Sequence, residues 1–327
     1  MSKLRNRPAG SVILVSSAGK ESVKLTLECL RRQTVSEQLE IVLAARPEEV
    51  QGLNTLDPEG FFELEVVSAD LTTSAIARSA AIQKARAEIV LFVEDHSFPV
   101  QKDWAERLIA AHQAGHVAVG PSMKNANPLT PSSWANLAIE YGQWINVPEA
   151  GLVDQLPGHN SSYKRAALMQ YGSELADKLE VEWVMQNEFR ARGETLWVDP
   201  EVSTAHLNFS NFKSAVRLHF LEGRMFAASR ANGWGPFRRA AYAVAFPLIF
   251  LVRLVRISRN LLGSDEGRPY FLRTLPYCIV YLLASAFGEG IGYAFSDGGQ
   301  RALLGELEYD RWKFIHDGEQ DVKLDYL

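Results

Sequence analysis

The sequence predicts an α/β fold, in which helices cover a central sheet, followed by a C-terminal region of helices. Two segments, Val12–Val15 and Ile89–Val93, are apolar without the alternation of a half-exposed strand, as expected of strands buried on both faces. Segments with apolar residues at helical spacing lie between such strands. From Ser210 onward, long uncharged runs and clustered arginines replace this pattern. With 327 residues, the chain can form one large domain or two ordinary ones.

The first part of the chain alternates predicted strands and helices. A basic start precedes Val12–Val15, but this apolar run is shorter than the roughly 7–15 residues of a secretory signal, so we expect a first strand. Gly19 and Lys20 do not form a phosphate-binding loop, because Leu14 stands where that motif needs its first glycine. The next elements expected are a helix at Glu21–Gln33, strands at Leu39–Ala44 and Leu64–Val67, and a helix at Thr73–Ala87.

The following part is less regular. We expect, in order, a helix at Trp104–Gln113, a short strand at Val117–Gly120, a long loop over Ser122–Val153 with one helix around Trp134–Trp144, a helix opening near Ala166, a helix at Leu179–Arg192 and a strand at Thr195–Val198. A long insertion of this kind often shapes a binding site.

The strand Ile89–Val93 runs directly into Glu94, Asp95 and His96. In helix-covered sheets, ligands bind at the carboxyl ends of the strands, so this polar turn stands where chemistry is expected. Its side chains offer hard oxygen ligands and one imidazole. Pro99 is expected to stop the strand. The other interpretation of these residues is a solvated turn without a function.

Several spaced motifs resemble the family 2 glycosyltransferases of the GT-A fold, over about Ser11 to His206. Glu94-Asp95-His96 with Pro99 and Trp104 behind it looks like the family's metal-binding acidic turn, although the family usually has Asp-x-Asp. The other matching motifs are Ala77-Arg78-Ser79, Gly158-His159-Asn160 with Lys164-Arg165, Glu182 eleven residues before Gly193, and the late His206. The resemblance implies a Rossmann-like mixed sheet flanked by helices, with residues 1–210 as the catalytic domain.

The resemblance also implies roles for individual residues. Glu182 is expected to be the catalytic base of an inverting transfer, although Val181 replaces the first acid of the family's usual pair. The expected donor-binding residues are Ser16, Arg78, Glu94 and Asp95, the acceptor-side residues are His159, Asn160 and Trp183, and the ligands of a divalent cation, Mn²⁺ or Mg²⁺, are Asp95, His96 and His206. The implied donor is a nucleotide sugar, UDP- or GDP-linked. From the residue types alone, Glu182 could equally be a solvated helix residue and Asn160 a turn former.

The composition limits the class of partner. The formal net charge of -5 argues against a general nucleic-acid binder. The two cysteines, Cys29 and Cys278, lie far apart and suggest neither a disulfide framework nor a zinc site, which fits a reducing, cytosolic environment.

The C-terminal region, residues 211–327, is expected to associate with a membrane. Between Phe212 and Arg273 there are eleven lysines and arginines against three acids. Two uncharged runs, Ala240–Val252 and Thr274–Gly288, are each shorter than the roughly 20 residues that span a bilayer. Arg253, Arg256 and Arg259 recur every three residues beside an apolar face, which favours helices lying in the membrane interface. A buried helical pair and a spanning hairpin are the alternatives.

Two functions of different classes follow. The first is a glycosyltransferase at the cytoplasmic face of the cell membrane, acting on a lipid-linked or polysaccharide acceptor held there. The second is a non-catalytic nucleotide-sugar-binding or membrane-scaffolding protein with a degenerate site, suggested by His96 and Val181. A donor-hydrolysis assay with and without Mn²⁺ separates them.

Overall fold

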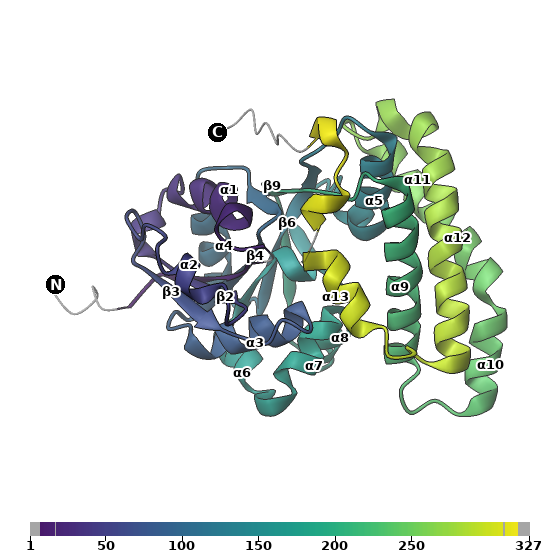
Figure 1. The fold of residues 1–327 in the computed structure, drawn as a ribbon, viewed down its shortest axis with the longest axis horizontal. Coiled ribbons are helices and arrows are strands. Elements are labelled where there is room, and N and C mark those ends of the chain that lie inside the picture. The colour runs from purple at the N-terminus through teal and green to yellow at the C-terminus, as the bar shows by residue number, and fades with distance from the viewer. Residues whose placement is uncertain (1–6, 17, 310, 320–327) are drawn as a thin grey trace. The chain divides into compact units, whose positions relative to one another are not determined.

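A computed structural model describes residues 7–16, 18–309 and 311–319. The chain forms two compact units (Figure 1). The first comprises Met1–Met123, Val147–Ala205 and Leu324–Leu327, and the second comprises Lys124–Asn146 and His206–Lys323. The assignment of residues 1–210 to a catalytic domain and 211–327 to a membrane-associated region stays a prediction.

A mixed sheet forms the centre of the first unit, as the sequence predicted. Its order is β3-β2-β1-β4-β8-β6-β9-β5, with β7 paired to β9. β1 is parallel to β2 and β4, β2 is parallel to β3, and β8 is antiparallel to β4 and β6. The strands are β1 (Gly10–Val15), β2 (Leu39–Ala45), β3 (Glu63–Ser68), β4 (Ile89–Glu94), β5 (Ser97–Pro99), β6 (Ala118–Asn125), β7 (Gly151–Val153), β8 (Ser162–Lys164) and β9 (Leu196–His206).

Helices cover both faces of the parallel part of this sheet. Successive side chains of a strand point to opposite faces, and in β4 the side chain of Leu91 joins the core under α1 and α4, while that of Phe92 lies under Arg78 of α3. Both side chains are fully buried, which explains the apolar run without alternation. The helices of this unit are α1 (Lys20–Arg31), α2 (Val50–Leu53), α3 (Ser74–Lys84), α4 (Trp104–Ala111), α6 (Arg165–Met169), α7 (Leu175–Glu180) and α8 (Glu182–Ala191).

Three expectations about the elements were wrong. Pro99 does not stop β4, which ends at Glu94, and Pro99 belongs to β5 instead. The expected helix Leu179–Arg192 is broken at Val181, whose non-helical backbone separates α7 from α8. The expected loop after Ser122 is partly strand, because β6 continues to Asn125.

The second unit is helical. It contains α5 (Pro131–Tyr141), α9 (Phe212–Arg230), α10 (Pro236–Val244), α11 (Phe246–Gly263), α12 (Phe271–Phe295) and α13 (Arg301–Tyr309). α9 and α12 run side by side (Figure 1), and their backbones approach so closely that a Cβ on Gly223, Gly288 or Gly292 would collide with the backbone of the other helix. Glycine is therefore required at these contacts.

The helical segment Arg268–Phe295 is long and apolar enough to cross a membrane. The expectation that both C-terminal runs are too short was therefore wrong for this one, because the helix continues through Arg273 and Glu289 at the two ends of the uncharged run. Half of its most apolar window is buried inside the protein, and core helices of soluble proteins have the same properties. α10 and α11 would qualify only as a pair, and they are bent by 56° at the break between them.

Candidate active site

The acidic turn lies at the carboxyl edge of the parallel strands. In the register of β1 and β4, Val15 is paired with Glu94, so Ser16 and Asp95 follow at the same edge of the sheet. Ser97 fixes the turn, because its hydroxyl accepts a hydrogen bond from the Glu94 backbone N–H at 2.9 Å. The buried carboxylate of Asp95 lies 2.9 Å from Nδ1 of the buried His96, and Nε2 of that ring lies 3.6 Å from Oε1 of Glu94.

The predicted Gly158-His159-Asn160 motif forms a short 3₁₀ turn whose side chains reach Glu94. Nδ1 of His159 lies 3.1 Å from Oε1 of Glu94, and the side-chain amide of Asn160 donates to Oε2 at 3.1 Å. Because β8 follows this turn and pairs with β4, the motif is held beside the end of β4. Lys164, in contrast, is paired with Ile89 at the other end of β4, away from the acidic turn.

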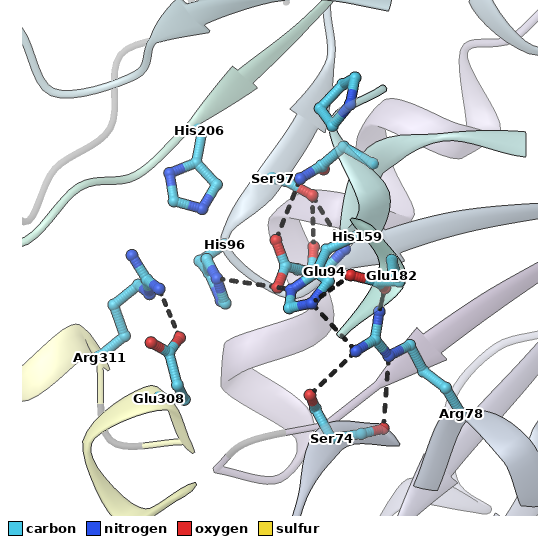
Figure 2. A network of polar contacts seen from close by, with 12 residues as sticks. Ser74, Arg78, Glu94, His96, Ser97, His159, Glu182, His206, Glu308 and Arg311 are labelled. Carbon is cyan, nitrogen blue, oxygen red and sulfur yellow. Dashed lines mark hydrogen bonds and ion pairs between the residues drawn. The ribbon is translucent and has the colours of Figure 1, made fainter. Parts of the chain in front are cut away.

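Glu182 is the first residue of α8, because the helix is interrupted at Val181. Its side chain is buried and bound by two cationic groups (Figure 2). Arg78 donates to Oε1 through Nη1, and Nε2 of His159 lies 2.9 Å from Oε2. Gly158 permits this approach, since a Cβ there would lie 2.7 Å from the carboxyl carbon of Glu182. The structure thus brings Arg78, Glu94, His159 and Glu182 into one network.

Arg78 is held from its own helix. Its Nη2 donates to the hydroxyl of Ser74 at 3.2 Å, and its guanidinium lies 5.6 Å from the ring centroid of Phe92. Burial disfavours its charge, but Glu182 and Glu94 outweigh burial and raise its pKa. Arg78 is therefore a fixed, buried cation at the carboxyl edge of the sheet.

The pKa values of the two groups facing Arg78 shift in opposite directions. Burial would raise the pKa of Glu182, but the charges of His159 and Arg78 outweigh burial and lower it. Burial and Arg78 would lower the pKa of His159, but Glu182 and Glu94 outweigh both and raise it to about 10. At neutral pH, Glu182 is a carboxylate and His159 an imidazolium.

The donor set at the acidic turn fits a divalent cation. The carboxylate of Asp95 and the imidazole of His96 lie together in a buried turn, and oxygen with imidazole is a set that Mn²⁺ accepts.

The remaining predicted site residues are Ser16, Trp183 and His206. The Ser16 hydroxyl accepts a hydrogen bond from the Gly19 N–H at 3.1 Å and closes the loop after β1. Trp183, next to Glu182, is 38% exposed. His206 is the last residue of β9 and the first of the second unit. Within that unit, its Nδ1 lies 2.9 Å from Oδ1 of Asn208, so its role as a metal ligand stays a prediction.

Sequence reasoning missed two residues that support the network, Ser74 and Ser97. Both leave a local signal, because Ser74 precedes Arg78 by four residues on one helix face and Ser97 follows Glu94 by three residues in a tight turn. It also missed the contact that makes Gly158 necessary, which no local pattern reveals.

No protein-family model matches the chain, and no curated protein matches it in sequence. Among solved structures, the mannosyltransferase PcManGT from Pyrobaculum calidifontis, in complex with GDP-Man and Mn²⁺, has a TM-score of 0.53 at 16% identity, covering 86% of this chain and 87% of its own. S. aureus TarS 1-349 in complex with UDP has a TM-score of 0.44 at 13% identity, covering 84% of this chain and 89% of its own. GalNAc-T7 with UDP, GalNAc and Mn²⁺ has a TM-score of 0.43 at 15% identity, covering 62% of this chain and 44% of its own. The first likeness shows that the chain has a GT-A-like fold.

Proposed function

We propose that the protein is a glycosyltransferase that transfers a sugar from a UDP- or GDP-linked donor to a membrane-held acceptor, lipid-linked or polysaccharide, with inversion. The observation that carries the proposal is the buried network at the carboxyl edge of the sheet, where the Glu182 carboxylate faces Arg78 and His159 beside the acidic turn. The GT-A-like fold supports it, since a neighbour with this fold is a mannosyltransferase in complex with GDP-Man.

Glu182 is the proposed catalytic base. An inverting transfer needs a carboxylate that takes the proton of the acceptor hydroxyl as it attacks the sugar. Glu182 is ionised, and its position at the start of α8 places it next to the exposed ring of Trp183, which offers an apolar face to an acceptor sugar. His159, which contacts Glu182, also contacts the carboxylate of Glu94, and the side chain of Asn160 donates to the same carboxylate.

Arg78 is the proposed partner of the donor diphosphate, and we propose that His159, which the resemblance assigns to the acceptor side, shares this role. Both cations bind the carboxylate of Glu182. A diphosphate brings a competing anion that planar guanidinium and imidazolium groups bind well. Partial withdrawal of these cations from Glu182 would raise the basicity of the carboxylate when the donor is in place. Donor binding and activation of the base are thereby coupled.

Asp95 and His96 would hold a divalent cation, with Mn²⁺ favoured over Mg²⁺ because the set includes an imidazole. When bound, such a cation supplies charge stabilisation for the leaving diphosphate.

The second unit is proposed to bind the cytoplasmic face of the cell membrane, as a monotopic rather than a spanning protein. Among the described residues, twelve of the sixteen exposed large hydrophobic side chains lie between 237 and 295, on α10, α11 and α12. Such a concentration of exposed apolar area is typical of an interaction surface. Arg256 and Arg259, also exposed on α11, complement anionic headgroups. Arg253 does not contribute, because it forms an ion pair with the buried Glu289 of α12. The expected surface stripe of three arginines is therefore reduced to two.

The test is a donor-turnover assay with the full-length protein. A panel of UDP- and GDP-sugars is incubated with Mn²⁺, with Mg²⁺ or with chelator, in the presence of anionic vesicles that contain lipid extracts as acceptor. Release of the nucleoside diphosphate from one donor, dependent on the cation, supports the proposal. If no donor reacts and none raises the melting temperature, the proposal is wrong.

A non-catalytic nucleotide-sugar-binding protein is the second candidate. One observation favours it: the Glu182 carboxylate is bound by two cations, which lowers its pKa and its basicity. In that case a nucleotide sugar would stabilise the protein against heat without any release of nucleoside diphosphate.

A further inference from the structure

The second unit contains a cluster of polar side chains that the proposed transfer does not use. Glu140 of α5 and His219 and Glu222 of α9 bring a carboxylate, an imidazole and a second carboxylate within 4.8 Å of one another. We propose that Glu140 and His219 bind a divalent transition-metal cation, such as Zn²⁺ or Mn²⁺, with Glu222 orienting the imidazole, at a site independent of the acidic turn.

The imidazole is oriented as in a metal site. His219 and Glu222 are three residues apart and lie on the same face of α9, so Nδ1 of the ring lies 3.0 Å from Oε2 of Glu222. A hydrogen bond from Nδ1–H to this carboxylate leaves the lone pair on Nε2, and carboxylates commonly orient metal-binding histidines in this way. The side chain of His219 is 1% exposed and that of Glu222 is 32% exposed, which gives the site a path to solvent.

Asn136 marks the point where the ligands converge. Its side-chain NH₂ donates to Oε1 of Glu140 and lies 3.3 Å from Nε2 of His219, while its carbonyl oxygen accepts from the backbone N–H of Phe209 at 2.7 Å. The positive end of an amide dipole thus stands between a carboxylate and an imidazole lone pair. A cation at this point would satisfy the same two acceptors with a full charge.

The charges around Glu140 leave an excess that a divalent cation would neutralise. Glu222 and Glu308 repel its carboxylate and Arg311 attracts it, but Arg311 is in an ion pair with Glu308. A charged Glu140 is therefore disfavoured by burial and by Glu222, and a bound divalent cation would offset both effects.

The ligand set selects the class of metal. A carboxylate with an imidazole suits Mn²⁺, Fe²⁺ or Zn²⁺ and is less suited to Mg²⁺, which prefers oxygen and water. Ligands about 2.1 Å from a cation lie about 3–4 Å apart, so atoms within 4.8 Å of one another need only small side-chain rotations.

The experiment uses full-length protein stripped of metal with a chelator and titrated with ZnCl₂ or MnCl₂ alone. Calorimetry gives the equivalents bound, and the melting temperature is read in parallel. The variants are Glu140→Gln and Glu222→Gln, which keep the side-chain shape, with Glu306→Gln on α13 as an exposed control. Asp95→Asn separates this site from the acidic turn. No transfer activity is measured, so the result does not depend on the proposed function.

We expect Asp95→Asn to retain a metal equivalent that Glu140→Gln and Glu222→Gln lose or bind at least tenfold more weakly. At a metal concentration of about 100 times Kd, Asp95→Asn should melt about 5–10 °C higher than without metal, and this rise should be absent when Glu140→Gln is added. Equal stoichiometry and affinity in the wild type, Glu140→Gln and Glu222→Gln would overturn the proposal. An Asp95→Asn protein that neither metal stabilises would do the same.

Discussion

Glu182→Gln is the substitution that tests the proposed active site most directly. It keeps the shape of the side chain but removes the charge that faces Arg78 and His159. If Glu182 is the base, the transfer rate at saturating donor should fall by roughly 10²–10⁴, the usual contribution of a positioned general base. Donor affinity should be unchanged or higher, because the two cations no longer have a competing carboxylate.

The same substitution should also destabilise the first unit. Removing one partner of a buried ion pair costs about 3–5 kcal/mol, because the other charge stays buried without compensation. The carboxamide oxygen introduced by Glu182→Gln still accepts a hydrogen bond from Arg78, and His159 can lose its proton. We therefore expect the lower end of this range, about 3 kcal/mol, in the free energy of unfolding.

The pH dependence gives a signature that a general packing defect would not produce. The folded-state pKa of His159 is raised to about 10 from an unfolded value of about 6.5. Its stabilisation is fully present below pH 6.5 and is lost as the pH rises through about 10. The wild type should therefore lose stability between pH 7 and 10, and Glu182→Gln should lose less over the same interval.

Glu188→Gln is the matched control. Glu188 lies on the same helix, but its side chain is 35% exposed and is paired with Lys178 at the surface. Loss of this ion pair should lower the free energy of unfolding by less than about 1 kcal/mol and leave the transfer rate unchanged. Chemical denaturation and transfer kinetics on both variants complete the comparison. A wild-type rate in Glu182→Gln would show that another group takes the proton, and a proportional loss of donor affinity would assign Glu182 to donor binding.

Three further predictions concern other residues. Gly158→Ala places a methyl group 2.7 Å from the carboxyl carbon of Glu182, so we expect a cost of about 1–3 kcal/mol in stability and at least a tenfold slower transfer. Asp95→Asn should abolish the dependence of donor turnover on Mn²⁺, measured as nucleoside diphosphate release, while the melting temperature changes by no more than about 2–4 °C. The double change of Arg256 and Arg259 to Gln should weaken sedimentation with anionic vesicles about 30-fold at low salt, since each arginine contributes about 1 kcal/mol, and the difference should shrink as salt screens the attraction.

Each of these has a control and an opposing outcome. Gly52→Ala adds a methyl into open space and should be silent; equal effects at the two glycines would remove the steric explanation. Turnover that stays responsive to Mn²⁺ in Asp95→Asn would move the cation to other ligands. Changing Arg32 and Lys84, exposed on the first unit, to Gln should leave vesicle binding intact. If both double variants lose vesicle binding equally, net charge and not a surface of the second unit governs the binding.

The sequence alone determined the α/β class and the position of the acidic turn. A strand buried on two faces must be continuously apolar, which a local stretch of sequence shows, and the polar residues directly after it stand at its carboxyl end. The candidate residues Arg78, His159, Asn160 and Glu182 were also named from sequence, through spaced motifs. No motif showed that Arg78 and His159 both bind Glu182.

Only the tertiary structure decided those partners. Arg78 and Glu182 are 104 residues apart in sequence, and they meet because β8 pairs antiparallel with β4 and because Val181 breaks the helix before Glu182. In the same way, the structure pairs Arg253 with Glu289 and removes it from the exposed surface. The physical reason is common to both cases. Apolar periodicity reports which face of an element is buried, whereas the free energy of a buried charge depends on which opposite charge the fold brings within a few ångströms of it.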